Sequence, residues 1–134
     1  MFKRNILYAA AALLFVMPSC KQVLTPQTLA GKWNYIKVEN PYSPNPPDTV
    51  PSQDIALNKP YIQLSATGQL LMMWGGKILS HGTYKIDGQN ISYTETITDG
   101  NKRTFPFYIK TLTDKQIIFE TKEQDAVRVT AAKE

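Results

Sequence analysis

The sequence predicts an all-β domain, an eight-stranded antiparallel up-and-down barrel, preceded by a signal peptide. From Leu29 onward, short runs rich in β-branched and aromatic residues alternate with Gly, Asp and Asn turns, and no run repeats apolar residues at helical spacing. After the second run the connections shorten to two to five residues, which makes neighbouring strands antiparallel. The expected strands are 32–39, 60–65, 69–73, 77–86, 90–97, 101–110, 116–121 and 126–130.

The hairpin turns predict how these strands pair. Residues directly opposite each other across a hairpin point to the same side of the sheet. Three-residue loops that end in glycine at 66–68, 74–76 and 98–100, with a two-residue turn at 87–88, place apolar residues opposite apolar ones. The expected pairs are Leu64 with Leu70, Ile62 with Met72, Met72 with Ile78, Tyr84 with Ile91, Gly82 with Tyr93, Ile91 with Phe107, Tyr93 with Phe105 and Glu95 with Arg103.

The paired positions converge on one apolar face. A sheet with such a face must be covered or must close on itself, and no helix is expected to cover it, so we expect closure. A barrel of eight strands has room for side chains or for one small ligand. The expected interior residues are Ile62, Leu64, Leu70, Met72, Ile78, Gly82, Tyr84, Ile86, Ile91, Tyr93, Phe105, Phe107, Ile109, Ile117, Phe119, Val127 and Val129.

The N-terminus has the three-part layout of a secretory signal. Lys3 and Arg4 precede an apolar run from Ile6 through Met17, and Pro18 and Ser19 then lead to Cys20. This run is shorter than the roughly 20 residues that a membrane-spanning helix needs. The alternative is a buried structural cysteine in a cytosolic helix, although a single cysteine directly after such a segment is typical of export.

The segment before Cys20 resembles the lipobox of bacterial lipoproteins. The resemblance implies cleavage before Cys20, a diacylglyceryl group on its thiol and a further acyl chain such as palmitate, which together give stable anchoring to membrane lipid. The predicted division is residues 1–19 as signal peptide, 20–28 as tether and short 3₁₀ turn, and 29–134 as barrel domain. Because no acidic run follows Cys20, we expect the periplasmic face of the outer membrane.

Charge and cysteine content exclude some functions. The signal contains two of the 15 basic residues, so its removal lowers the formal net charge from +4 to +2. The remaining lysines are scattered singly between apolar residues, which does not indicate a nucleic-acid surface. With Cys20 acylated, no disulfide can form, and the fold must be held together by packing.

A second resemblance concerns the barrel. Gly31-Lys32-Trp33 is similar to the Gly-x-Trp opening of the lipocalins, and Thr25–Thr28 matches the short turn that closes their barrel base. Thr113-Asp114 and Arg128 fall where that family has its other two marks. The chain thus resembles lipocalin-like lipoproteins of Gram-negative bacteria, with a calycin-type barrel. The resemblance implies that Trp33 plugs the base and that Arg128 packs across it, although strand alternation points Arg128 outward unless a bulge intervenes.

The end of the barrel opposite Trp33 is the expected mouth. The loops at 40–59, 74–76, 98–100 and 122–125 should all emerge there if the up-and-down order holds. The first loop contains five prolines and is long for a hairpin connection, which is typical either of a semi-rigid functional flap or of a variable solvated loop. Tyr42, in a loop otherwise poor in apolar residues, favours a contact.

Just inside the mouth, Ser80, Glu95 and Arg103 are expected side by side on three strands, all pointing inward. Inward charges are costly unless they pair with each other or with a ligand. In one interpretation Arg103 binds an anionic head group such as a carboxylate, and Glu95 orients the Arg103 side chain. The apolar tail would then lie among Tyr84, Tyr93, Phe105 and Phe107. The other interpretation is an internal salt bridge that closes a fully packed core.

Catalysis and metal binding receive little support from the sequence. His81 is the only histidine, its alternation points outward, and no nucleophile lies at a productive spacing from it. A single imidazole is too few for a metal site, and no cofactor motif is present. Met72, Met73 and Trp74 fit core and rim better than a binding stripe.

Two functions follow. The first is a membrane-anchored carrier or sensor of a small hydrophobic or amphipathic ligand. The second is a non-enzymatic interaction or inhibitor module of the cell envelope, with a packed core, that docks a partner through its flap and rim, including Tyr42 and Trp74.

Overall fold

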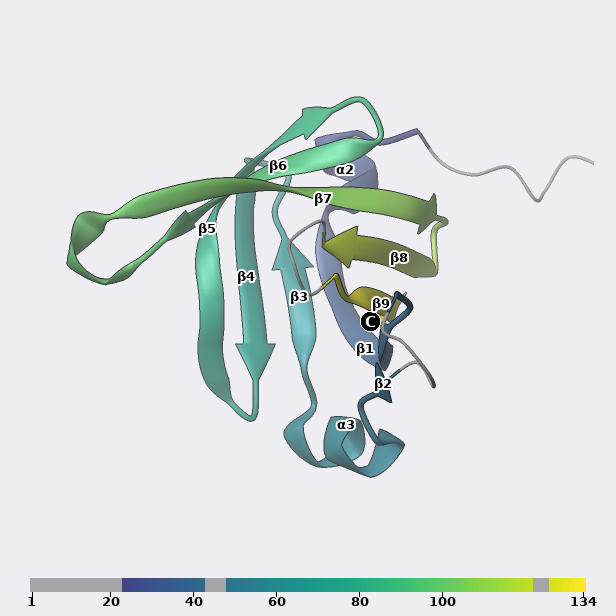
Figure 1. Cartoon of the computed structure of the whole chain (residues 1–134). Coiled ribbons are helices and arrows are strands. Elements are labelled where there is room, and N and C mark those ends of the chain that lie inside the picture. Colours follow the sequence, from purple (N-terminus) through teal and green to yellow (C-terminus); the bar gives the residue numbers. More distant parts are fainter. Residues whose placement is uncertain (1–22, 43–47, 122–125) are drawn as a thin grey trace, which may run out of the picture.

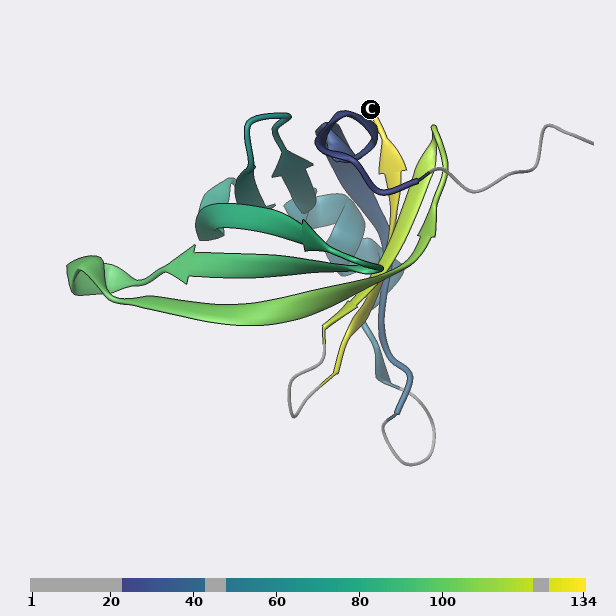
Figure 2. The ribbon, with the colours of Figure 1, turned by 90° about the horizontal axis from the view of Figure 1, so that it is seen from above.

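The computed structural model describes residues 23–42, 48–121 and 126–134, so the predicted signal peptide and Cys20 lie outside the described residues. Its sheet has the strand order β2-β1-β3-β4-β5-β6-β7-β8-β9, and β1 also pairs with β9. Strands β1 and β3 to β9 therefore close an antiparallel up-and-down barrel of eight strands, as predicted (Figures 1 and 2). The strands are β1 (Gly31–Asn40), β2 (Asp48–Thr49), β3 (Tyr61–Leu64), β4 (Gln69–Trp74), β5 (Lys77–Asp87), β6 (Asn90–Thr96), β7 (Lys102–Leu112), β8 (Gln116–Thr121) and β9 (Arg128–Lys133).

A single helical turn closes one end of the barrel, the base. Helix α2 (Pro26–Leu29) is α-helical rather than 3₁₀, because the Leu29 and Ala30 N–H groups donate to carbonyls four residues earlier. Thr25 and Thr28 form a reciprocal capping box at its N-terminus. The turn brings the Leu29 carbonyl to the indole of Trp33, whose Nε1 donates a hydrogen bond to it at 2.9 Å. Trp33 is fully buried, so it plugs the base as predicted.

The connection from β1 to β3 contains structure that the sequence did not predict. Helix α3 (Ser52–Asn58) begins after Pro51, ends at Lys59 in the left-handed conformation and buries Ile55. It lies along the rim of the opposite end, the mouth, where the Gly75 N–H donates to the Asn58 carbonyl at 2.8 Å. The helix is too short for a repeating apolar pattern, which is why periodicity missed it.

The predicted register is confirmed in two hairpins and shifted in a third. Between β3 and β4, and between β6 and β7, the predicted pairs are all present. Between β5 and β6 the two-residue turn is Gly88-Gln89, so Ile91 faces Ile86 and Gly82 faces Glu95. The shift is two residues along the strand, which leaves every side chain on its predicted face.

The β4–β5 hairpin departs from the prediction through a bulge. Its loop is the two-residue Gly75-Gly76, which pairs Met73 with Ile78, and a bulge at Leu79 then restores Met72 opposite Ser80. The extra residue keeps Ser80 on the interior face but leaves Ile78 outside. Ile78 is 61% exposed, so its predicted interior position is wrong.

The core fills the barrel from the base upward. All other predicted interior residues with apolar side chains are buried or packed against the buried cluster. Leu112 and Ala131 join them, because β7 and β9 extend two to three residues farther than predicted, and Leu29 joins them from α2. The small residues Ala131 and Ala132 have weak strand propensity, so pairing of β9 with β1 and β8 decides their conformation.

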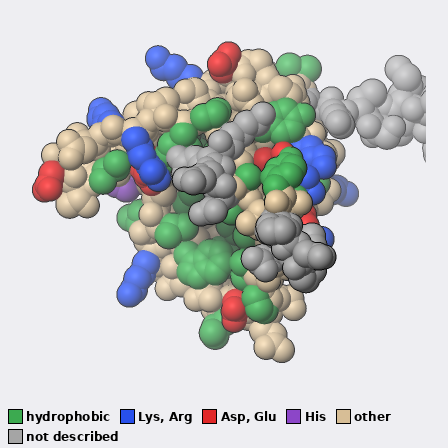
Figure 3. Space-filling view, in the orientation of Figure 1, with side chains coloured by type: hydrophobic (Ala, Val, Ile, Leu, Met, Phe, Trp, Pro, Cys, Tyr) green, Lys and Arg blue, Asp and Glu red, His purple; other side chains and the backbone are tan. Residues whose placement is uncertain are grey.

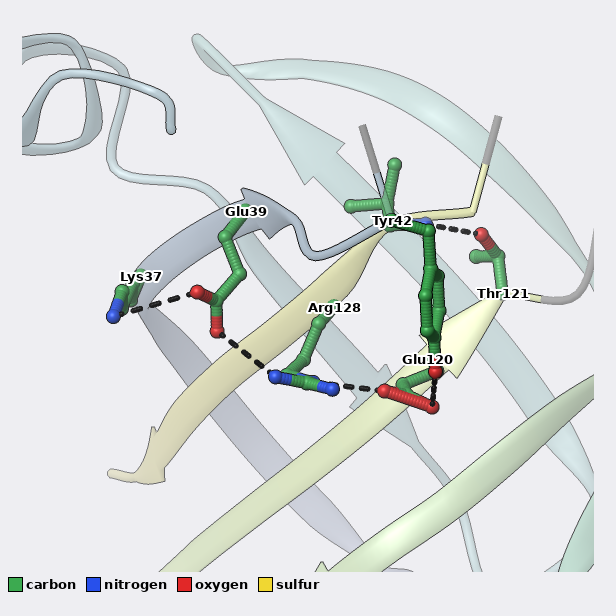
Figure 4. Close-up of polar contacts among 7 residues, drawn as sticks. Lys37, Glu39, Tyr42, Glu120, Thr121 and Arg128 are labelled. Carbon is green, nitrogen blue, oxygen red and sulfur yellow. Dashed lines mark hydrogen bonds and ion pairs between the residues drawn. The ribbon is translucent and has the colours of Figure 1, made fainter. Parts of the chain in front are cut away.

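The first and last strands are joined on the outer face by a chain of charges, which we call the closing seam (Figure 4). Arg128 on β9 donates through Nε to Glu120 on β8 at 2.8 Å and lies 3.8 Å, through Nη1, from Glu39 on β1. The Tyr42 hydroxyl donates to the other Glu120 oxygen at 3.4 Å, and Lys37 pairs with Glu39 at 3.5 Å. Glu120 is 7% exposed, and its hydrogen bond raises the pKa of the Arg128 guanidinium. The seam links the three strands where the barrel closes.

Arg128 does not lie where the resemblance to the lipocalins placed it. This side chain points outward, near the mouth end of β1, because β9 alternates regularly with Val129 inward. It does not pack across Trp33. The pairing instead places Lys133 opposite Trp33, with its ammonium 5.4 Å from the ring centroid.

We expect Arg128→Met to lower the free energy of unfolding by about 1–3 kcal/mol, because it leaves the nearly buried Glu120 carboxylate without its cation. Urea denaturation measures this change. Lys37→Met is the matched control, since its exposed ion pair contributes about 0–1 kcal/mol. Equal stabilities of the two variants would contradict the role of the seam.

Candidate functional site

The mouth opens into a pocket of about 590 Å³ inside the barrel, which we call the mouth pocket. Figure 3 shows hydrophobic side chains in the middle of the view, with Lys, Arg, Asp and Glu side chains around them. Six of the seven predicted ligand-binding residues line the pocket, and Tyr84 does not. The lining consists of Met72, Leu79, Ser80, Tyr93, Glu95, Arg103, Phe105, Phe107, Thr121 and Val127.

Four side chains form a polar network on one wall. Arg103 Nε donates to Glu95 Oε1 at 2.7 Å. Ser80 donates to the other Glu95 oxygen, and its Oγ lies 2.6 Å from the Tyr93 hydroxyl. The Glu95 side chain is 16% exposed whereas that of Arg103 is 54% exposed, so the carboxylate faces the pocket and the guanidinium reaches the rim. The predicted ion pair is thus present, beside an open pocket rather than within a packed core.

The protonation of this network follows from its contacts. Burial alone would raise the pKa of Glu95, but the hydrogen bonds from Ser80 and Arg103 and the charge of Arg103 outweigh it and lower the pKa. Burial raises the pKa of Tyr93, which remains a neutral phenol at physiological pH. The wall therefore presents an ionised carboxylate already held by an arginine.

Aromatic rings form the apolar part of the pocket. The ring centroids of Phe105 and Phe107 each lie within 5.5 Å of that of Tyr93. The Phe107 ring also packs against Phe119, deeper in the core. The Arg103 guanidinium carbon lies 4.9 Å from the Phe105 centroid. Stacking on Phe105 keeps the cation at the boundary between the apolar interior and solvent. The pocket is therefore apolar below and charged at one side of its opening.

The structure also shows what the sequence prediction misplaced and missed. Tyr84 lies toward the base, where its hydroxyl donates to the Ser65 carbonyl at 2.7 Å. Thr121 lines the pocket, and its alternation with Phe119 was the available signal. Leu79 lines it because of the bulge, for which the sequence has no clear signal.

The mouth pocket combines charged, polar and apolar groups. Among the described residues, no group of three or more His, Cys, Asp or Glu side chains lies close enough to hold a metal ion. Within the same ranges no helix is long and apolar enough to span a bilayer. The network offers a guanidinium, a carboxylate and two hydroxyls, which suit an anionic or hydrogen-bonding head group above an apolar tail.

Comparisons with protein-family models, with curated proteins and with solved structures find no match for this chain.

We expect Glu95→Gln to lower the free energy of unfolding by about 1–2 kcal/mol at neutral pH, because Arg103 loses a charged partner. A carboxyl whose pKa is lowered on folding contributes stability above its ordinary pKa of 4.5, and this contribution is lost as the pH falls through the lowered value. The gap between the two proteins should therefore narrow below pH 4.5 in urea titrations. Asp99→Asn, at an exposed turn, is the control, and a gap independent of pH would contradict the assignment.

Proposed function

We propose that this protein is a lipid-anchored lipoprotein of the outer membrane, facing the periplasm, whose lipocalin-like barrel binds a small amphipathic and anionic ligand in the mouth pocket. The protein acts as a carrier or sensor and not as an enzyme. It requires no cofactor. The observation that carries the proposal is an apolar pocket inside the barrel with an arginine at its opening.

The anchor is supported by the N-terminal sequence and by the position of Val23 at the base of the barrel. The basic, apolar and small-residue segment ends at Cys20, the single cysteine. Val23 lies beside α2, since its carbonyl accepts a hydrogen bond from Thr28 at 2.7 Å. Three residues span at most about 11 Å, so an acyl group on Cys20 would hold the base near the membrane. The mouth would then face away from the bilayer.

The ligand class is supported by the size and polarity of the mouth pocket. A volume of about 590 Å³ lies within the range of small-molecule sites, roughly 300–1,000 Å³. Phe105 and Phe107 suit an aliphatic tail, and the half-exposed Arg103 suits a carboxylate, sulfonate or phosphate. Glu95 already accepts a hydrogen bond from the Arg103 guanidinium. It therefore competes with an anionic ligand for Arg103 and lowers the affinity of the pocket for such ligands.

The lipocalin-like assignment is supported by the plugged base. Gly31 has a φ of 143°, which is unfavourable for residues with a side chain. Two residues later, the indole of Trp33 is hydrogen-bonded to the helical turn that closes the barrel. Lys133 takes the place over the ring that an arginine was expected to hold. The open pocket favours ligand binding over an interaction or inhibitor module with a fully packed core.

Lipid attachment predicts that the wild-type chain, expressed in a Gram-negative host, incorporates alkyne-palmitate and enters the detergent phase of Triton X-114. Cys20→Ser removes the acceptor thiol and should abolish incorporation. Ser19→Ala keeps a small residue before the cysteine and should preserve labelling. Labelling of the Cys20→Ser protein would refute the anchor.

Ligand binding predicts that the mature chain takes up dansyl-undecanoic acid, read as a blue shift and increase in dansyl fluorescence. Arg103→Gln should weaken this binding about 10- to 100-fold, because a charge-assisted hydrogen bond contributes about 1.5–3 kcal/mol. Glu95→Gln should strengthen binding of decanesulfonate, since the competing carboxylate is removed and this probe stays charged at all working pH values.

Lys102→Gln is the matched control, an exposed cation next to Arg103 that does not line the pocket. It should bind both probes as the wild type does. Absence of uptake by the wild-type protein, together with native mass spectra free of any copurifying small molecule, would refute the proposed function.

A further inference from the structure

Strands β5 and β6 separate at Gly82. The last pair of their ladder toward the mouth joins Gly82 to Glu95. A Cβ atom at Gly82 would collide with the carbonyl oxygen of Thr94, so only glycine allows the two backbones to approach this closely. Beyond this contact β5 continues beside β4, while the β6–β7 hairpin projects away from the barrel (Figures 1 and 2).

The separation leaves two strand edges facing each other across a cleft, which we call the notch, between residues 77–81 of β5 and 95–98 of the β6–β7 hairpin. In the described part of the chain, residues 77–81 have ladder partners on β4 alone, and Thr96 on β7 alone. The notch has a volume of about 660 Å³ and is lined from both edges. Open strand edges present backbone donors and acceptors in the spacing that another strand matches.

Apolar side chains are exposed at the same edges. Ile78 and Leu79 are 61% and 63% exposed, and Ile97 on the opposite side is 39% exposed. The bulge at Leu79 produces this arrangement, because it turns Ile78 outward while Ser80 remains inside. Folded proteins usually protect a strand edge by charge, by proline or by cover. An edge flanked by exposed aliphatic residues therefore indicates an interface.

We propose that the notch binds an extended segment of a partner polypeptide by β-strand addition, and that this segment carries an acidic side chain. A peptide backbone satisfies both edges, and alternate side chains of the segment pack on Ile78 and Ile97. Lys77 begins the β5 edge and Lys102 pairs with Thr96 on the other side. Arg103 and Glu95, which line the notch, form an ion pair with each other. The border is therefore positively charged and complements an acidic segment.

A bilayer fits the notch poorly, although the exposed residues are apolar and lysines lie beside them. Insertion would place open strand edges in hydrocarbon, where no group satisfies the backbone. A second copy of this chain also fits poorly. Its corresponding edges lie inside its own notch, bounded on both sides by the folded barrel, so neither is free to enter.

The test uses the full chain in dodecyl maltoside and a phage-displayed library of random dodecapeptides with one fixed central aspartate. Selected peptides are synthesised, and their binding is measured by fluorescence anisotropy and by hydrogen exchange. We expect protection of the Thr96 amide and of those amides in 77–81 that do not bond to β4. The double variant Ile78→Lys/Ile97→Lys should weaken binding at least tenfold, and replacement of the fixed aspartate by asparagine should weaken it several-fold.

The matched control is Ile36→Lys/Leu57→Lys, two residues that are also exposed, at 55% and 79%, but lie outside the notch. It should bind the peptides as the wild type does. Neither Ile78 nor Ile97 lines the mouth pocket, so the notch variant should retain uptake of dansyl-undecanoic acid. Failure of this inference is therefore distinguishable from failure of the proposed function.

Three outcomes would overturn the inference. The first is that the selection yields no peptide that binds the wild type more tightly than the notch variant, or that the selected peptides protect amides outside the notch. The second is protection of residues 77–81 by phosphatidylethanolamine and phosphatidylglycerol vesicles without peptide, which would assign the notch to a membrane. The third is a dimer in light scattering that the notch variant dissociates, which would assign it to a second copy.

Discussion

The pairing of β1 with β9 is the contact on which the rest of the structure depends. Each strand contributes an apolar face that cannot remain in water, and the two short helices of the described residues, α2 and α3, are too small to cover it. Closure removes both edges of the sheet and creates an inside. The Arg128–Glu39 ion pair and the buried Ala131, which pairs with Tyr35, both lie at this junction. Without closure the rings at the mouth would line a surface and not a pocket.

The two ends of the barrel differ because of what closes them. At the base, the Thr25 capping box positions one helical turn, which in turn accepts the indole N–H of Trp33. Leu29 and Trp33 are fully buried at this end. At the mouth, the strands are long, Gly82 lets β5 and β6 cross closely, and the hairpins then diverge. Glu95 and Arg103 lie where apolar interior meets solvent, which is where a charged pair is tolerated because it keeps contact with water.

The mouth pocket and the notch are adjacent and share one wall. Ser80, Glu95 and Arg103 border both spaces. A ligand that draws Arg103 away from Glu95 would alter the charge that a segment in the notch meets. If both proposals hold, the two binding events are coupled through this ion pair, with the reciprocal effect that linkage requires. A sensor that reports an occupied barrel to a partner polypeptide would need a connection of this kind.

Much of the fold follows from the order of residues alone, because strand alternation has a period of two and a hairpin fixes parity between neighbours. This is why the pairs Glu95–Arg103, Tyr93–Phe105 and Leu64–Leu70 follow from glycine-containing turns. The same parity brought six of the seven expected pocket residues together. Parity cannot detect a register error of two residues, such as the predicted Tyr84–Ile91 pair in place of Ile86–Ile91. Such an error leaves every side chain on its correct face.

Tertiary structure decided the features that local pattern does not encode. The bulge at Leu79 lies in the pairing of β5 with β4, and it moved Ile78 outside. The length of β9 is determined by its two partners and not by its alanines, and the outward position of Arg128 near the mouth follows from that register. Whether side chains fill the interior at the mouth depends on how far β5 and β6 diverge beyond Gly82. A sequence specifies which side chains face inward, but the space left between them depends on contacts among strands distant along the chain.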